Sequence, residues 1–456
     1  MSAESQGGRD MLKSILALII FWGYNSFSLQ AVDHYVVPPG TPGVVSTPDY
    51  TNWLTAATSI QNAVDSAATG ETIFVTNGNY LLTNQILIAK AVIIRSFHDG
   101  AIDRTNTVIN GNYPNVTNRC FYINNVTSLI AGFTISNGYS PTGGAVYIYS
   151  KGTVSNCLIA DSVAINKGGG ICYDNGGTVA DCLIYNNVSS NYGGGIYGYG
   201  TLKNCLVFNN RAVVKGGGIS WVQGTAVDCV VSNNVVSNSL SMNTFGGGIY
   251  IVNSGSFVSN CVIRNNSAYA SGGGAAAAGG GVAMNGGVLR NCLLAYNYSS
   301  FLAGGVGREG EVTVQNCTIV SNISASYAGG VAGGKYDNSI IYFNRASGGG
   351  GSNYYDWASA GVYCTNCCVA PTNIGALGGL YLAAGSVNNV EQNPAFVDAA
   401  SGNYRLSVNS PCLNAGTNES WMTNALDLDG RQRIRYGIVD IGAYEIIYNG
   451  TIYSIP

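Results

Sequence analysis

The densest charge in the middle of the chain is a group of five residues: Arg308, Glu309, Glu311, Lys335 and Asp337. Aligning Val306 with Val331, one repeat later, brings all five near one edge of adjacent repeats. β-Elimination from a uronate needs a basic side chain beside carboxylates, so this group is the candidate catalytic set. A surface ion-pair cluster, which contributes little to stability, is the simpler and favoured interpretation.

A second candidate site is aromatic. Runs of glycine are followed at one fixed offset by Tyr147, Tyr197 and Tyr250, and Trp221 falls between them. Residues two apart face the same side of a strand, so the tyrosines are predicted to form an exposed ladder. Flat aromatic faces with polar tips suit sugar rings, and all four residues are candidate substrate-binding residues. Aromatic stacking that only stabilises the sheet is the alternative.

Other catalytic and metal-binding patterns are weak. The chain has two histidines, His34 and His98, and it lacks the paired aspartates that glycosidic cleavage requires. Asp427, Asp429 and Gly430 match part of a calcium loop but lack its full spacing. Structural salt bridges to Arg431 or Arg433 are the favoured interpretation, and calcium stays a candidate ligand. No other metal or cofactor is predicted. Three cysteines suit a disulfide at least as well as zinc: Cys364, Cys367 and Cys368.

Composition and the N-terminus indicate an exported protein. The net charge is −3 with no basic stripe, which argues against nucleic acid as a partner. Arg9 and Lys13 flank an apolar run at residues 15–22, and a small residue, Ala31, follows. This pattern predicts a cleavable signal peptide over residues 1–31, with an uncleaved anchor as the alternative. We expect secretion or a location at the cell surface or outer envelope, with no other membrane-spanning segment.

Two alternating motifs repeat along the chain. A polar residue precedes Cys and two apolar residues at seven sites, and a glycine run precedes Ile or Val between them. The cysteines are mostly 23–25 residues apart, with two longer intervals of 31 and 32 residues. They are Cys157, Cys182, Cys205, Cys229, Cys261, Cys292 and Cys317. Such a period indicates a solenoid, and short apolar runs between Gly, Asn and Ser indicate strands rather than helices.

The repeat predicts a solenoid coil of about 24 residues with three short strands, stacked in parallel at about 4.8 Å per coil. The cysteines are predicted to stack inside, because free cysteine behaves as a small hydrophobe. Asn-Asn pairs that follow each Cys are predicted to form a hydrogen-bonded stack at one turn, and the glycine runs to form another turn. The longer intervals predict inserted loops at residues 237–245 and 271–281.

The ends differ from the repeat. Ile60, Ala63, Val64 and Ala67 follow Ser59 at helical spacing, which predicts a short capping helix over the first coil. We predict three parts: the signal peptide at 1–31, the capped solenoid at 32–388, and a C-terminal capping or extension segment at 389–456.

The residues from Ser59 to Ala67, the stretch Gly70–Val75 and the seven Cys repeats resemble the pectin-lyase-like right-handed β-helix superfamily over residues 55–380. Asn393–Phe396, Asp427–Arg431 and Asp440–Glu445 resemble the C-terminal region of exported bacterial β-helix proteins that carry varied surface anchors ("choice-of-anchor" proteins). About eleven residues follow Glu445 without an apolar span, so we do not expect the anchor part of this resemblance to apply. The resemblance implies an all-β, right-handed, single-stranded parallel β-helix. It does not imply one function, because the superfamily includes lyases, hydrolases, epimerases and adhesins.

Two functional hypotheses follow, and the sequence leaves open whether the protein is an enzyme. The first is an exported, adhesin-like or structural protein that binds a polysaccharide or cell-surface glycan. The second is a polysaccharide lyase or glycoside hydrolase that acts on an acidic polysaccharide in a groove along one sheet.

Overall fold

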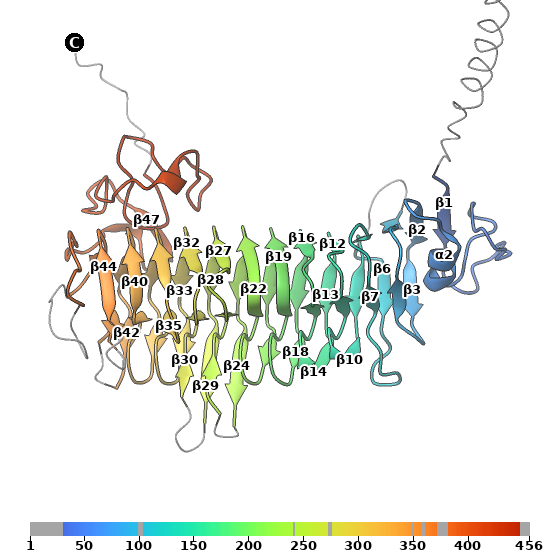
Figure 1. The fold of residues 1–456 in the computed structure, drawn as a ribbon, viewed down its shortest axis with the longest axis horizontal. Coiled ribbons are helices and arrows are strands. Elements are labelled where there is room, and N and C mark those ends of the chain that lie inside the picture. Colours follow the sequence, from blue (N-terminus) through green and yellow to red (C-terminus); the bar gives the residue numbers. More distant parts are fainter. Residues whose placement is uncertain are drawn as a thin grey trace, which may run out of the picture.

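The computed structural model describes residues 31–98, 104–239, 242–271, 276–348, 351–356, 361–371 and 382–446. Residues 1–30, and so nearly all of the predicted signal peptide, lie outside this range. The described chain is an elongated parallel β-solenoid whose coils follow one another along the long axis (Figure 1).

The solenoid has three parallel sheets, as three strands per coil predict. The sheet of 22 strands is formed by two rows, because a turn divides its strand in most coils. The two rows merge in β19 (Ile196–Lys203) and β22 (Ile219–Val227), which run unbroken through both. The first row also contains β4 (Ile86–Ile88), β7 (Phe121–Ile123), β11 (Val146–Ile148), β15 (Ile171–Tyr173), β26 (Ile249–Ile251), β31 (Val282–Met284), β35 (Val306–Arg308), β39 (Val331–Ala332) and β43 (Tyr354–Tyr355). The second row also contains β1 (Asp33–Val36), β2 (Thr72–Thr76), β5 (Ile93–Phe97), β8 (Leu129–Ala131), β12 (Thr153–Ser155), β16 (Thr178–Ala180), β27 (Phe257–Ser259), β32 (Val288–Arg290), β36 (Thr313–Gln315), β40 (Gly334–Asp337) and β44 (Val362–Thr365).

The other two sheets complete each coil. The 12-stranded sheet contains β3 (Gly78–Leu81), β6 (Thr107–Asn110), β9 (Thr134–Ser136), β13 (Leu158–Ala160), β17 (Leu183–Tyr185), β20 (Leu206–Phe208), β23 (Val230–Ser232), β28 (Val262–Arg264), β33 (Leu293–Ala295), β37 (Thr318–Val320), β41 (Ile340–Tyr342) and β45 (Cys368–Val369). The nine-stranded sheet contains β10 (Tyr139–Thr142), β14 (Val163–Lys167), β18 (Val188–Ser189), β21 (Arg211–Ala212), β24 (Val235–Asn238), β29 (Ser267–Ala270), β34 (Tyr298–Ser299), β38 (Ile323–Ser324) and β42 (Arg345–Ala346).

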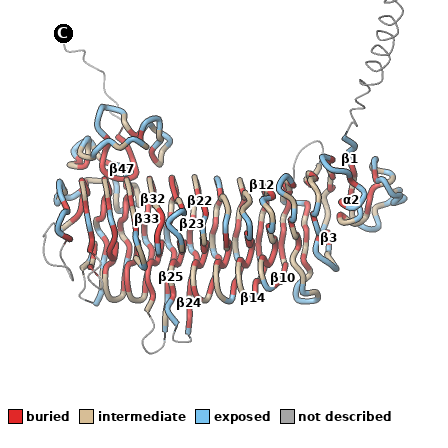
Figure 2. The backbone as a smooth tube through the Cα atoms, viewed as in Figure 1, coloured by how far each residue is buried: buried red, intermediate tan, exposed pale blue. Residues whose placement is uncertain are grey.

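The repeat motifs take the places that their chemistry requires. All thirteen cysteines are buried and free, so no disulfide forms at Cys364, Cys367 and Cys368. The polar residue before each Cys has a positive φ, for example 57° at Asp181 and 50° at Asn204. Asn and Asp tolerate this left-handed backbone better than other L residues, which explains their place before the cysteine. Burial alternates along the strands, and the inner side chains form one continuous core (Figure 2).

The second asparagine of each pair forms the predicted stack, which continues through Asn297, Asn322 and Asn344, where the preceding residue is not asparagine. Its amide nitrogen donates to the Oδ1 of the equivalent asparagine one coil on, at 2.9–3.1 Å from Asn187 to Asn344. The first asparagine of each pair has a positive φ of 54–57°. The two roles together turn the chain from the 12-stranded to the nine-stranded sheet.

Both predicted insertions are present. Ile219 pairs with Ile249 and Ile249 with Val282, which are register steps longer than one standard coil. The extra residues lengthen β24 and β29 and add a pair of short strands, β25 (Thr244–Phe245) and β30 (Ala277–Ala278). These strands project from one side of the solenoid (Figure 1).

The ends of the chain leave the repeat. Helix α2 (Ile60–Ser66) lies at the N-terminal end and buries Ile60, Ala63 and Val64, as its spacing predicts. The C-terminal segment contains the antiparallel pair β46 (Phe396–Asp398) and β47 (Asn403–Leu406) and the 3-10 helix η2 (Ser420–Met422). This segment packs along the side of the last coils (Figure 1).

Candidate functional site

The three tyrosines of the predicted ladder lie on the outer side of the first row. Cys172 pairs with Tyr147 and Tyr197, and Ser220 pairs with Tyr197 and Tyr250. From Tyr147 to Tyr250 a tyrosine therefore occurs in every second coil, with a small side chain in the coil between; in the coil before Tyr147 the same position holds Tyr122. We call Tyr147, Tyr197 and Tyr250 the tyrosine face. Tyr147 and Tyr197 are partly exposed, whereas Tyr250 is 4% exposed because neighbouring side chains cover its ring.

Each tyrosine of this face contacts a cation. The Arg119 guanidinium lies 4.7 Å from the ring centre of Tyr147, the Lys167 ammonium 4.9 Å from Tyr197, and the Lys215 ammonium 4.2 Å from Tyr250. Such contacts stabilise a partly exposed pair by about 0.5–1 kcal/mol. Three cations and three aromatic faces therefore alternate along the solenoid axis.

The positions of the two lysines follow from the repeat. Each lysine directly precedes a glycine turn, and isolated bridges pair Tyr192 with both Lys167 and Lys215. Lys167 and Lys215 are therefore two coils apart. Arg119 comes from another position in its coil, and its Nη2 donates to Ser140 Oγ at 2.7 Å. Burial lowers the pKa of Arg119, which nevertheless stays a cation at neutral pH.

Glu309, predicted as catalytic, lies at the far end of the tyrosine face. Tyr250 donates its hydroxyl hydrogen to Glu309 Oε2 at 2.5 Å, and Lys215 Nζ donates to the Tyr250 oxygen at 2.6 Å. The Lys215 nitrogen is 3.5 Å from Glu309 Oε2. Burial raises the pKa of Tyr250, and the carboxylate of Glu309 adds to this shift. The tyrosine is therefore a neutral donor in this three-residue network.

The rest of the predicted catalytic set does not assemble around Glu309. Arg308 ends β35 in the first row, whereas Lys335 and Asp337 lie on β40 in the second row. Val306 does pair with Val331, as the alignment predicts. Among the residues that the structure describes, no ion pair joins two members of the set Arg308, Glu309, Glu311, Lys335 and Asp337. Burial raises the pKa of Asp337, and Glu419 from the C-terminal segment adds to this shift.

An open groove of about 810 Å³ runs along the turns between the first and second rows, beside the tyrosine face. Its polar side chains come from successive coils: Lys151, Asp174, Asn175, Tyr199 and Gln223. Tyr147 donates its hydroxyl hydrogen to Asp174 Oδ2 at 3.1 Å, which connects the tyrosine face to the groove.

Glycine backbone forms much of the groove floor. A Cβ at Gly200 would lie 2.7 Å from the ring of Tyr173, and one at Gly224 would lie 2.6 Å from the ring of Trp221. Trp221 is fully buried beneath this floor, and its neighbour in register is the core residue Ile251. We therefore withdraw Trp221 from the predicted binding residues. Its position two residues after the buried Ile219 places its side chain inside.

Comparison with known proteins identifies the fold. The protein-family model described as "Right handed beta helix region" matches residues 119–285. The chain is a right-handed parallel β-helix. A similar solved structure is that of pectate lyase Pel9A, with a TM-score of 0.45 and 16% identity, covering 91% of this chain and 96% of that chain. No curated protein matches the sequence.

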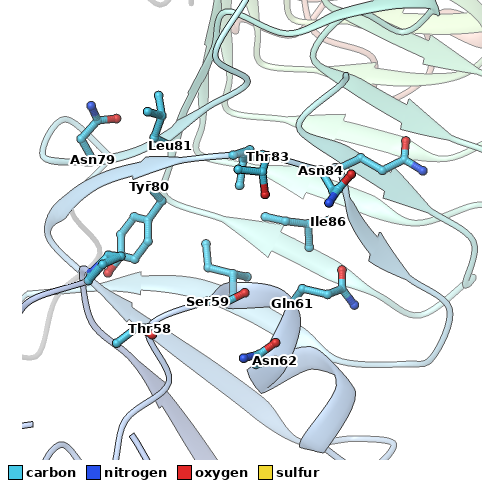
Figure 3. A pocket seen from close by; sticks show the side chains of 14 residues that line it. Thr58, Ser59, Gln61, Asn62, Asn79, Tyr80, Leu81, Thr83, Asn84 and Ile86 are labelled. Atoms are coloured by element: carbon cyan, nitrogen blue, oxygen red, sulfur yellow. The ribbon is translucent and has the colours of Figure 1, made fainter. Parts of the chain in front are cut away.

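The β-helix has a second cavity of about 440 Å³ at its N-terminal end, between α2 and the loop from β3 to β4 (Figure 3). Gln61, Asn62, Asn79 and Asn84 supply polar groups, and the lining contains no charged side chain. The cavity therefore offers hydrogen bonds without a charged group for catalysis.

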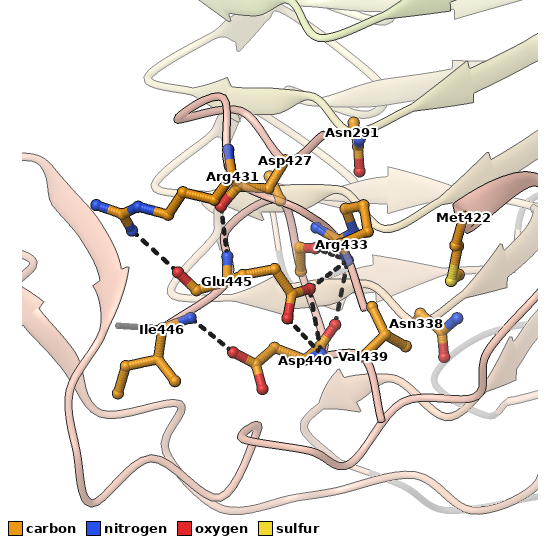
Figure 4. Close-up of polar contacts among 12 residues, drawn as sticks. Asn291, Asn338, Met422, Asp427, Arg431, Arg433, Val439, Asp440, Glu445 and Ile446 are labelled. Carbon is orange, nitrogen blue, oxygen red and sulfur yellow. Dashed lines mark hydrogen bonds and ion pairs between the residues drawn. The ribbon is translucent and has the colours of Figure 1, made fainter. Parts of the chain in front are cut away.

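The partial calcium motif is part of a buried charge network in the C-terminal segment (Figure 4). Asp427 Oδ1 accepts hydrogen bonds from the backbone of Asp429 and Arg431, and its Oδ2 accepts one from Glu445. Asp429 pairs with Arg405 and with Arg431. These oxygens have protein partners in the structure, and calcium at this loop stays a prediction. No group of three or more His, Cys, Asp or Glu side chains in the described ranges is placed to hold a metal ion.

The fully buried Arg433 is the centre of this network. Its Nη2 is 3.1 Å from Glu445 Oε1 and donates to the carbonyl oxygens of Asp440 and Gly442. The network holds the C-terminal segment against β37, where the Ala443 amide donates to Thr318 Oγ1 at 3.0 Å. It therefore has a structural role. The predicted salt bridge forms between Asp429 and Arg431, whereas burial raises the pKa of Glu445, so Arg433 contacts a neutral carboxyl at neutral pH.

Sequence reasoning missed the three cations of the tyrosine face. A signal was present, because Lys167 and Lys215 each directly precede a glycine run, while Tyr192 and Phe245 hold the same position in alternate coils. In the part of the chain that the structure describes, no helix is long and apolar enough to cross a membrane.

Proposed function

We propose that this β-helix is an exported, adhesin-like protein that binds an extended polysaccharide along the tyrosine face. The observation that carries the proposal is the contact of each tyrosine with a cation: Tyr147 with Arg119, Tyr197 with Lys167 and Tyr250 with Lys215. An aromatic face packs against the apolar side of a sugar ring, and the cations suit carboxylate or sulfate groups. The adjoining groove lies along the same coils and can hold the outer edge of the polymer.

The spacing favours a polymer over a small ligand. Tyrosines two coils apart are separated by about 9.6 Å, since parallel strands lie about 4.8 Å apart. This distance is close to the length of two sugar residues in an extended chain. Tyr147 and Tyr197, the two partly exposed tyrosines, therefore contact alternate sugars of one polysaccharide strand, and each single contact can be weak.

Affinity electrophoresis in gels that contain pectate, alginate, carrageenan or a neutral glycan tests the proposal. Tyr197→Ala should weaken binding about tenfold, which corresponds to about 1.4 kcal/mol. The matched control is Tyr185→Ala, because Tyr185 stacks on Phe208 at 5.0 Å in the 12-stranded sheet, away from the tyrosine face. Unretarded migration in every gel, or equal losses in the two variants, would contradict polysaccharide binding at this face.

A second candidate function is cleavage of an acidic polysaccharide by elimination. The contact of Lys215 with Tyr250 and Glu309 supports it, since a basic group and a proton donor lie within 3.5 Å of one carboxylate. Incubation with pectate and alginate, with and without calcium, tests it by the ultraviolet absorbance of unsaturated uronates. Product that disappears in Lys215→Gln would establish a lyase, and product that persists in Lys215→Gln would remove this site.

A further inference from the structure

Along the tyrosine face, coils with two aromatic side chains alternate with coils that carry a lysine and a small side chain. One coil carries the aromatic pair Tyr192 and Tyr197, whose ring centres are 6.2 Å apart, and another carries Phe245 and Tyr250 at 6.1 Å. The coil between them carries Lys215 and Ser220 at the same positions. The coil before them carries Lys167 and Cys172.

We infer that the ligand is an anionic polysaccharide with one charged group on every second sugar; this inference rests on the proposed function. The chemical period of the surface is two coils, or about 9.6 Å, and each period offers one cation and one aromatic pair. A polymer of alternating charged and neutral sugars places its anions at Arg119 and Lys167, which lie two coils apart, and a neutral ring at an aromatic pair. Lys215 is already paired with Glu309.

The balance of charge supports this ligand over a polymer charged on every sugar. Among the described residues, no carboxylate forms an ion pair with Arg119 or Lys167. A ligand anion can therefore pair with them. A uniformly charged polymer would carry two anions for each cation of the face, and burial of the second, unpaired anion is costly. Near Tyr250, the Glu309 carboxylate would repel such an anion.

Isothermal titration with three oligosaccharides of equal length tests whether the ligand is charged on every second sugar, on every sugar or on none. The first alternates glucuronate with N-acetylglucosamine, the second is an oligogalacturonate charged on every sugar, and the third is a neutral N-acetylglucosamine oligomer. The alternating oligomer should bind at least about tenfold more tightly than either of the others, which is about 1.4 kcal/mol. Raising the salt concentration should weaken the binding of the alternating oligomer and leave that of the neutral one unchanged.

Lys167→Gln should remove most of the preference for the alternating oligomer without changing the affinity for the neutral one, and Lys167→Arg should restore it. Arg264→Gln is the control, because Arg264 is an exposed cation on β28 in the 12-stranded sheet. Equal or tighter binding of oligogalacturonate, or no effect of Lys167→Gln, would overturn this inference. If Tyr197→Ala still weakens binding in that case, polysaccharide binding stands. If none of the three oligomers binds, the inference and the proposed function both fail.

Discussion

Replacement of Asn266 by alanine should destabilise the middle of the solenoid, because this side chain is one rung of the buried asparagine stack. Its Oδ1 accepts hydrogen bonds from the backbone and side-chain nitrogens of Asn234, both at 3.0 Å. Its Nδ2 donates to Val231 O at 2.9 Å and to Asn297 Oδ1 at 3.0 Å. Asn266 is fully buried, so water cannot replace these partners.

The size of the effect follows from the groups left without partners. Alanine removes the acceptor of the Asn234 backbone amide and one donor to Val231 O. Each buried polar group that loses its partner costs about 1–3 kcal/mol. The Asn234 side chain still donates to Val207 O, and the Asn266 backbone still donates to Asn297 Oδ1. We therefore expect a loss of about 2–6 kcal/mol in the local stability of these coils.

Hydrogen exchange measures this loss, because solenoid coils can open locally and a single unfolding energy does not describe them. Amides of residues 229–270 should exchange faster in Asn266→Ala, and those of the first coils should not change. Asn265→Gly is the control, since Asn265 is exposed and has a φ of 57° that glycine adopts freely. A loss below about 0.5 kcal/mol, or equal exchange in the two variants, would refute the argument.

Three further predictions concern the buried groups. Burial raises the pKa of Glu445 from 4.5 to about 9, against the opposing effect of Arg433. Between these pH values the folded state holds a proton that the unfolded state releases, so the free energy of unfolding should fall as the pH rises from 5 to 9. Glu445→Gln should reduce this fall. Thermal melts at each pH test both expectations. Gly217→Ala should cost about 1–3 kcal/mol in chemical denaturation, because its Cβ would lie 2.3 Å from the Gly247 oxygen. Gly255→Ala should cost far less, because the new Cβ would meet the flexible end of the Gln223 side chain. A thiol reagent should label no cysteine in the folded protein and all 13 after denaturation, whereas a disulfide would lower the second count.

The repeat motifs carried most of the information about the fold. Cysteine, asparagine and glycine each have one role per coil, and neighbouring coils confirm each role by repeating it. The cysteine column, the asparagine stack and the helix after Ser59 could therefore be predicted. The division of the largest sheet into two rows could not, since it depends on a short turn whose residues vary from coil to coil.

The candidate site was harder to predict, because side chains on the outer surface follow no strict repeat. The tyrosine face follows from strand alternation, but the orientation of Glu309 toward Tyr250 depends on two small residues, Ala283 in the coil between and Gly307 in the coil of Glu309. The partnership of Glu419 with Gln315 joins positions 104 residues apart, and no local pattern indicates it. Long-range contacts of this kind appear only in the folded chain.

A crystal structure of the protein with a bound acidic hexasaccharide tests polysaccharide binding most directly. The account predicts an oligosaccharide that lies parallel to the solenoid axis, with alternate rings over Tyr147 and Tyr197 and an anionic group beside Lys167. An oligosaccharide in the N-terminal cavity of Figure 3, or one that crosses the coils on another sheet, would contradict it.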